Sequence, residues 1–397
     1  MLAVVVSLGA CSKDGGGEGD ASSSRIDAMT ADGETTGNDA ADATVDDDTT
    51  RAEDANGIVD SSDDTGGSGS DDTSREHDTT AMVDILVCNN SNWTSDCDYK
   101  SLGKASSAAM NGDVVGIRKG TYKDCTKWDT DNLTIRGVDG RPHFKDKTCG
   151  RKGIFIIAAG TENVTVENIE FSGMKVRDEN GAGIRHHGGN LTVRNIYAHD
   201  GQEGILAGDG KHTITIENSK FERLGKNGMA HGIYINKIDK LVVRNSEFLS
   251  SKSQGHEFKT RARETVVECS TIASLDGKDS RSFDIPNGGK TVLRKNVIEQ
   301  GPSSVNSGIV GYAAEGAGNN HPQDFTMEDN ILINDLNKGT FIRIYNPNET
   351  SATIQNNKFY GPGTELDGAS LDSSNMTDLD RKKDFGSYPK LPDPPCP

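Results

Sequence analysis

One eight-residue pattern recurs along most of this chain and restricts the folds that it can adopt. Four residues of each copy alternate between apolar and polar, which predicts a strand with one buried face. Successive copies begin 23 to 34 residues apart, and a period of that size is typical of a solenoid. The copies are VTVENIEF (164–171), LTVRNIYA (191–198), ITIENSKF (214–221), LVVRNSEF (241–248), TVVECSTI (265–272), TVLRKNVI (291–298), FTMEDNIL (325–332) and ATIQNNKF (352–359).

A second apolar segment lies between successive copies. These segments are GAGIRHH (181–187), EGILAGD (203–209), HGIYINK (231–237), HEFKTRA (256–262), SFDIPNG (282–288), SGIVGYA (307–313) and TFIRIYN (340–346). Two or three short strands therefore fill each repeat and leave no room for a helix. The sequence predicts an all-β fold, a parallel β-helix with strand repeats over about residues 112–360. Residues 99–122 read as a short capping helix followed by a first coil.

Asparagine marks one position of the repeat. It is the fifth residue of the first four copies, Cys269 takes that position next, and later copies carry asparagine at position five or six. We expect these side chains to face inward at a corner, where an amide can bond to its stacked neighbours and to turn backbone. The asparagines are Asn168, Asn195, Asn218, Asn245, Asn296, Asn330, Asn356 and Asn357.

The negative charge of the chain is concentrated near its start. Residues 12–80 carry 20 Asp or Glu and 4 Lys or Arg, whereas residues 81–397 carry 41 acids and 39 bases. The first segment has little to bury, and we expect it to be a disordered, solvated tether. The remainder is nearly neutral and lacks the basic surface of a nucleic-acid-binding protein.

The first eleven residues, MLAVVVSLGAC, resemble the end of a bacterial lipoprotein signal. The resemblance implies that Cys11 is lipidated and that the lipid is the only membrane contact. A basic segment is missing before the apolar run, so either the true start lies upstream or this interpretation is wrong. We therefore predict a signal at 1–11, a linker at 12–80, a β-helix at 81–370 and a tail at 371–397. The protein would be lipid-anchored at the cell envelope or outer membrane surface, or secreted.

Outside the cytoplasm, the six remaining cysteines can form disulfides. Cys88, Cys97, Cys125 and Cys149 cluster in the first coils and are the expected bonded set, with no pairing chosen. Cys269 lies within a strand pattern, and we expect it to be a buried thiol.

Chemistry-bearing residues gather in the second segments. Equivalent positions of successive coils stack about 4.8 Å apart, so outward side chains line a groove along the axis. We expect Glu257 and Lys259 to point into this groove on either side of an inward Phe258. The other groove candidates are Arg185, His231, Tyr234, His256, Arg261, Asp284, Asn287 and Glu315.

Such a strip of cations suits an anionic sugar polymer. Arginine grips a uronate carboxylate, and neutralising that carboxylate acidifies the proton on the adjacent carbon. Lys259 is the candidate base, and His256 or His231 the candidate proton donor. Arg185 and Arg261 would neutralise the uronate. Tyr234, Asp284, Asn287 and Glu315 are candidate substrate-binding residues.

Two resemblances add to these inferences. The coil pattern and its helical entry resemble the right-handed parallel β-helix of the pectate-lyase-like superfamily, and the HGIYI, GHEFKTRA and DIPNGG segments resemble uncharacterised bacterial β-helix proteins. The run GHEFKTRARETVVECSTI is loosely similar to chondroitinase-B and alginate-lyase type lyases. That similarity implies that Glu257 helps to hold Ca²⁺ and that Lys259 is the base. The spacing between the acid and the lysine differs from that of those enzymes, and SFDIPNGGKT lacks their Arg–His pair.

We predict a monomeric lyase that cleaves an acidic, uronate-containing polysaccharide by β-elimination. Three alternatives stay open: a carbon-5 epimerase, a hydrolase that pairs Glu257 with Asp284, and a non-catalytic glycan-binding or cell-surface module. Nucleotide-binding, zinc-peptidase and serine-hydrolase motifs are absent from the sequence. No cofactor is implied beyond a possible Ca²⁺, for which there is no loop signature.

Overall fold

The computed structural model describes residues 83–397 except residue 319. These residues belong to one compact unit. The predicted lipidation at Cys11 and the acidic linker at 12–80 lie outside the described residues. No helix in the described part is long and apolar enough to cross a membrane.

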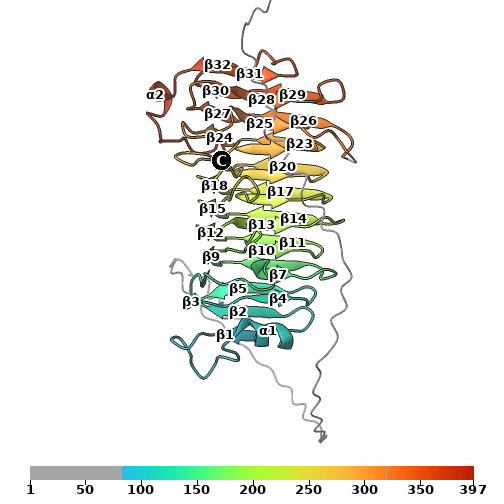
Figure 1. Ribbon diagram of the computed structural model, residues 1–397, viewed down its shortest axis with the longest axis vertical. Helices are drawn as coiled ribbons and strands as arrows, with labels where there is room; N and C mark the ends of the chain where they lie inside the picture. The colour runs from blue at the N-terminus through green and yellow to red at the C-terminus, as the bar shows by residue number, and fades with distance from the viewer. Residues whose placement is uncertain (1–82, 319) are drawn as a thin grey trace, which may run out of the picture. The chain divides into compact units, whose positions relative to one another are not determined.

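Three parallel sheets run the length of the described unit, and each coil contributes one strand to each sheet (Figure 1). Sheet A contains β1 (Ile85–Val87), β2 (Val114–Arg118), β5 (Thr134–Val138), β8 (Val164–Glu167), β11 (Leu191–Arg194), β14 (Thr213–Glu217), β17 (Lys240–Arg244), β20 (Glu264–Glu268), β23 (Lys290–Arg294), β26 (Asp324–Glu328) and β29 (Ser351–Gln355). Sheet B contains β3 (Thr121–Tyr122), β6 (His143–Lys145), β9 (Glu170–Ser172), β12 (Tyr197–His199), β15 (Lys220–Glu222), β18 (Glu247–Leu249), β21 (Thr271–Ala273), β24 (Val297–Gln300), β27 (Ile331–Asn334), β30 (Lys358–Tyr360) and β32 (Met376–Leu379).

Sheet C contains β4 (Thr126–Trp128), β7 (Gly153–Ile157), β10 (Ala182–His186), β13 (Glu203–Ala207), β16 (Ile233–Ile235), β19 (Phe258–Thr260), β22 (Phe283–Ile285), β25 (Gly308–Tyr312), β28 (Thr340–Ile344) and β31 (Thr364–Asp367). The expected parallel β-helix is therefore confirmed. Each eight-residue copy supplies a sheet A strand and then a sheet B strand, and each intervening segment supplies a sheet C strand.

Stacked apolar side chains fill the interior of the coils. Phe221 stacks on Phe248 with ring centroids 5.0 Å apart, and Phe258 stacks on Phe283 at 4.4 Å. All four rings are buried. Burying a phenylalanine side chain stabilises a fold by about 1.5–3 kcal/mol, so each coil is held mainly by the coils above and below it.

The fifth residue of each copy makes the bend between sheets A and B. Asn168, Asn195, Asn218 and Asn245 all have φ between 48° and 57°, and Cys269 has φ 55°. Asparagine tolerates this left-handed conformation better than most residues do. The expectation that these early asparagines face inward is wrong, because the bend turns them outward, where they are half-buried or exposed.

An inward asparagine ladder forms one position later, in the last coils. The Asn296 amide donates to Asn330 Oδ1 at 3.1 Å, and the Asn330 amide donates to Asn357 Oδ1 at 2.9 Å. Both amides also donate to backbone carbonyls of the preceding coil, Val267 at 2.9 Å and Leu293 at 2.8 Å. These buried polar groups are therefore satisfied by their stacking, as the sequence predicted for a corner asparagine.

Helix α1 (Leu102–Ala108) caps the first coils, as predicted. The Ser101 hydroxyl accepts a hydrogen bond from the Lys104 N–H, and Leu102 and Ala105 are buried. At the other end, β32 adds a strand to sheet B within the segment that we assigned to a tail, and α2 (Arg381–Asp384) follows it.

Three disulfides link described cysteines: Cys88 to Cys97, Cys125 to Cys149, and Cys269 to Cys396. The expected bonded set is confirmed. The expectation of a buried Cys269 thiol is wrong, because Cys269 occupies the outward bend position rather than an inward strand position. Its sulfur there meets the C-terminal segment and ties it to the coils.

Candidate functional site

One outward column of sheet C carries four of the predicted site residues, Arg185, Tyr234, Lys259 and Asp284. The strand register stacks Arg185, Leu206, Tyr234, Lys259, Asp284, Gly311 and Arg343 in successive coils. Phe258 points into the core, as predicted, so Lys259 takes the outward side of β19. The column therefore places Lys259 in the middle, with an arginine three coils away in each direction.

Asp284 connects the charged groups at the centre of the column. Its Oδ2 lies 3.7 Å from Lys259 Nζ and 3.5 Å from His256 Nε2, and its Oδ1 lies 3.4 Å from an Arg281 nitrogen. Burial alone would raise the pKa of Asp284, but the cationic neighbours outweigh it and lower the pKa to about 2. Asp284 is therefore a carboxylate at neutral pH.

Two histidines stack beside this centre, with ring centroids 4.9 Å apart. The backbone N–H of His256 donates to His231 Nδ1 at 3.0 Å, and the backbone N–H of Arg281 donates to His256 Nδ1 at 3.3 Å. Burial lowers the pKa of His256 to about 3 against the opposing charge of Asp284, and burial also lowers the pKa of His231 far below its usual range. Both rings are therefore neutral and carry their proton on Nε2.

Arg261 connects candidate residues that lie outside the central column of sheet C with Tyr234, which lies on that column. Its guanidinium donates to the Tyr234 hydroxyl at 2.8 Å, to Asn287 Oδ1 at 2.7 Å, and to both carboxylate oxygens of Glu315 at 2.6 and 3.0 Å. These residues come from four coils, and the structure brings them together as one network. The Arg261 charge is already matched by Glu315, so its first effect is to hold these side chains in place.

The sequence analysis missed two residues of the site, Glu203 and Arg281. Glu203 is fully buried, and burial raises its pKa well above the usual range, against a hydrogen bond from the His231 backbone and the charges of Arg185 and Lys259. Arg281 lies beside Asp284, and its guanidinium carbon lies 5.9 Å from the Tyr345 ring centroid. An acid at the start of the otherwise apolar EGILAG segment was the available signal for Glu203.

Glu257 does not lie on the outward column with Lys259, so the expectation that the two side chains point outward together is wrong. It precedes β19 at a corner, is fully buried, and its Oε1 accepts a hydrogen bond from the Ser251 N–H at 2.6 Å. Burial raises its pKa, and the nearby carboxylates of Asp279 and Glu299 raise it further. Within the described residues, Glu257 belongs to no group of three His, Cys, Asp or Glu side chains spaced to hold a metal ion.

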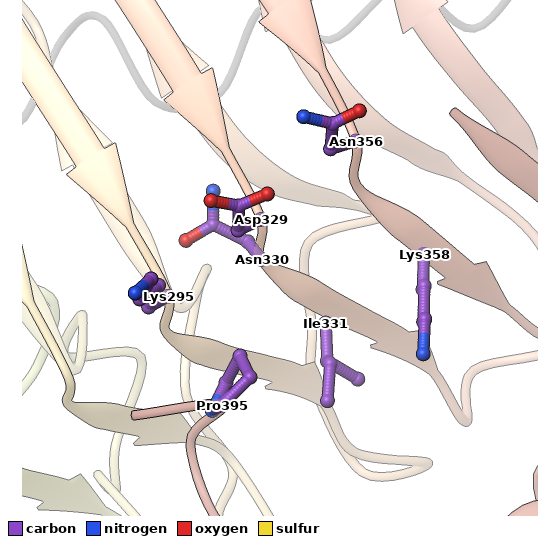
Figure 2. A pocket seen from close by; sticks show the side chains of 7 residues that line it. All are labelled: Lys295, Asp329, Asn330, Ile331, Asn356, Lys358 and Pro395. Atoms are coloured by element: carbon purple, nitrogen blue, oxygen red, sulfur yellow. The ribbon is translucent and has the colours of Figure 1, made fainter. Parts of the chain in front are cut away.

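A separate hollow lies between sheets A and B near the C-terminal segment (Figure 2). Its volume is about 380 Å³, and it is lined by Lys295, Asp329, Asn330, Ile331, Asn356, Lys358 and Pro395. It forms where the segment tied by Cys396 lies over the bends of the last coils. None of the predicted site residues lines it.

Comparison with known proteins supports the fold. No protein-family model and no curated protein matches the sequence. Among solved structures, the pectate lyase Pel9A matches with a TM-score of 0.51 and 15% identity over 78% of this chain and 85% of that chain. The GH136 lacto-N-biosidase from Eubacterium ramulus matches with a TM-score of 0.43 and 14% identity over 75% of this chain and 67% of that chain. The chain therefore has a pectate-lyase-like parallel β-helix fold.

Proposed function

We propose that this protein cleaves an acidic, uronate-containing polysaccharide by β-elimination in the groove of sheet C. The observation that carries the proposal is the buried Lys259 side chain beside Asp284, at the centre of an outward column with arginines on both sides. The likeness in fold to a pectate lyase agrees with this function but does not carry it.

The reaction needs a base next to a neutralised carboxylate. Lys259, in its amine form, takes the proton from the carbon that bears the uronate carboxylate. The electron pair left on that carbon forms a double bond to the next carbon, and the glycosidic oxygen leaves with the bonding pair.

Glu203 suits the role of proton donor better than the two histidines. A neutral imidazole that donates its proton becomes an imidazolate, which is a poor product near neutral pH. Glu203 is kept protonated by burial, and its pKa responds to the charge of Lys259. We therefore infer that Glu203 donates the proton that the leaving oxygen takes. His231 and His256 then orient the substrate as N–H donors.

The length of the column favours a polymer over a single sugar. Arg185 and Arg343 each stand three coils from Lys259, which is about 14 Å in either direction at the spacing of neighbouring strands. Acidic sugars on either side of the cleavage point can therefore meet a guanidinium. The hydrolase alternative loses support, because Glu257 lies in a buried corner and not opposite Asp284.

The test incubates the full-length protein with a panel of uronic-acid polymers and follows the absorbance of the unsaturated product. We expect product from at least one polymer, and a rate at least about 10³-fold lower for Lys259→Met with polymer binding retained. Lys290→Met is the matched control, because Lys290 is a half-exposed lysine on sheet A, and it should keep the full rate.

Three outcomes would overturn the proposal. Binding without any product would indicate a glycan-binding module. Exchange of polymer protons with solvent, without cleavage, would indicate an epimerase. Product formation at an unchanged rate by Lys259→Met would show that Lys259 is not the base.

A further inference from the structure

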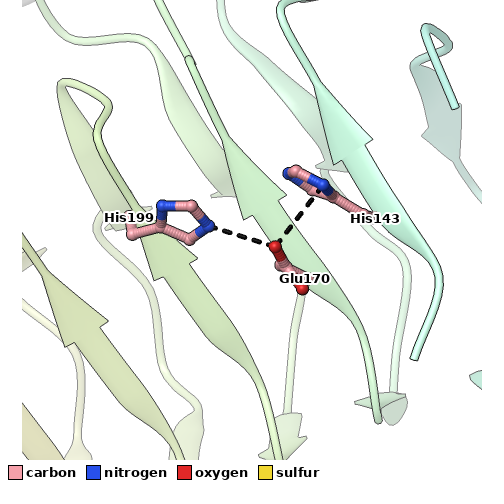
Figure 3. A group of neighbouring side chains, drawn as sticks. All are labelled: His143, Glu170 and His199. Carbon is pink, nitrogen blue, oxygen red and sulfur yellow. Dashed lines mark hydrogen bonds and ion pairs between the residues drawn. The ribbon is translucent and has the colours of Figure 1, made fainter. Parts of the chain in front are cut away.

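Three side chains on sheet B converge away from the groove, on the strands β6, β9 and β12 (Figure 3). His143 Nδ1 lies 3.4 Å from Glu170 Oε1, and His199 Nε2 lies 3.2 Å from the same oxygen. The three atoms all lie within 4.8 Å of one another. Their side chains are 25%, 25% and 15% exposed, so the cluster is accessible to solvent but not fully solvated.

Two of the three donor spacings are close to those of a tetrahedral metal centre, and the third, between the two histidine nitrogens, is at most 4.8 Å. Bonds of about 2.0–2.1 Å from zinc to nitrogen or oxygen place neighbouring donor atoms about 3.3–3.4 Å apart. The two nitrogen-to-oxygen distances, 3.4 and 3.2 Å, lie at or close to this value. Two imidazoles and one carboxylate also form a common donor set for zinc, and leave the fourth position open to water.

The ring nitrogens that face away from the cluster have partners of their own. His199 Nδ1 lies 2.6 Å from Asp200 Oδ2, and Arg223 holds that carboxylate with nitrogens 2.9 and 2.8 Å from its oxygens. A proton on Nδ1 leaves a lone pair on Nε2, which then faces another lone pair on Glu170 unless a cation lies between them. A carboxylate behind a ligating histidine is the usual arrangement around a protein-bound metal.

The other histidine is oriented in the same way. His143 Nε2 lies 2.7 Å from the Ser172 hydroxyl, which leaves Nδ1 to face Glu170. Tyr197 stacks on the His199 ring with centroids 4.2 Å apart and limits its rotation. The cluster thus has oriented donors and a supporting shell, built from three successive coils.

We propose that His143, Glu170 and His199 bind one divalent transition-metal ion of the zinc class. Imidazole donors favour such ions over Ca²⁺ or Mg²⁺, which prefer sets of oxygen ligands. Because each ligand comes from a different coil, the ion cross-links three coils of sheet B. The site is independent of the groove chemistry, since its ligands lie on sheet B and the groove lies on sheet C.

Titration of the chelator-treated full-length protein with ZnCl₂ tests the proposal by calorimetry, with Co²⁺ absorption as a second readout. We expect one zinc ion per chain and a visible Co²⁺ spectrum of a tetrahedral centre. Glu170→Gln and His199→Ala should abolish this binding, and Asp200→Asn should weaken it about 10–100-fold. CaCl₂ should neither bind at this site nor displace Co²⁺ from it.

Glu247→Gln is the matched control, because Glu247 occupies the position of Glu170 three coils further along sheet B and pairs with Lys220. It should bind zinc like the unaltered protein. Circular dichroism of each variant, recorded without metal, checks that the coils are intact. Zinc binding that is equal in the unaltered protein and in folded His199→Ala would overturn the proposal, as would the absence of zinc binding to the unaltered protein.

Discussion

At the scale of single residues, Arg261 does the most to organise the candidate site. Its guanidinium contacts Tyr234, Asn287 and Glu315, and its side chain is 9% exposed. Lysine could not replace it, because an ammonium lacks the planar fork that meets a carboxylate with two parallel hydrogen bonds. A residue expected to bind substrate is thus also the residue that holds Tyr234, Asn287 and Glu315 together.

We predict a measurable coupling between Arg261 and Glu315. In a double-mutant cycle of Arg261→Gln and Glu315→Gln, urea unfolding should give a coupling free energy of about 1–2 kcal/mol, since Glu315 is partly screened by solvent. The cycle of Arg263→Gln and Asp239→Gln is the control. That pair is exposed and joined at 3.4 Å, and its coupling should stay below about 0.5 kcal/mol. Equal coupling in both cycles would contradict the role of Arg261.

At the scale of elements, the bend between sheets A and B repeats a left-handed residue. Asparagine fills it in the early coils, but Lys295 and Asp329 fill it later, with φ 54° and 57°. A lysine is strained in this left-handed conformation, because its Cβ clashes with the backbone and its side chain makes no compensating local hydrogen bond. The bend therefore tolerates several residue types, at a small cost in the free energy of unfolding.

We predict that Lys295→Asn stabilises the protein. Asparagine should raise the free energy of unfolding by about 0.5–1 kcal/mol, because it adopts the left-handed conformation with less strain. Urea unfolding measures the change. Lys290→Asn is the control, since Lys290 lies in the extended strand β23, where asparagine should be neutral or destabilising. A gain of the same size in the control would contradict the explanation.

At the scale of the whole molecule, a buried acidic corner makes stability depend on pH. Burial raises the pKa of Asp279 to about 6 and the pKa of Glu299 to about 8. Both groups ionise at lower pH in the unfolded chain than in the folded protein. Through these two groups the folded protein binds more protons than the unfolded chain between about pH 4.5 and 8, so the stability that they contribute falls as the pH rises through that window.

We predict that Glu299→Gln flattens this dependence. Each such group lowers the free energy of unfolding by up to about 1.4 kcal/mol per pH unit within its window. The stability of the variant relative to the unaltered protein should therefore increase as the pH rises from 5 to 8. The midpoint of urea unfolding, recorded at each pH, measures this difference in stability. Glu349→Gln changes an exposed glutamate and should keep the original slope. An unchanged slope in Glu299→Gln would show that Glu299 does not stay protonated in the folded protein.

The sequence by itself determined the solenoid. Apolar and polar residues alternate within segments that recur every 23 to 34 residues, and this pattern fits stacked parallel strands and little else. It also identified the outward column around Lys259, since alternation tells which side chains share a face. Only the tertiary structure decided the positions of residues outside the alternating strands. At corners the alternation of inward and outward side chains breaks. Glu257 therefore lies buried beside other acids, and Glu203 lies in the candidate site. Cys269 points outward and bonds to Cys396. Contacts between coils, such as those joining His143, Glu170 and His199, depend on loop lengths that only the stacked structure resolves.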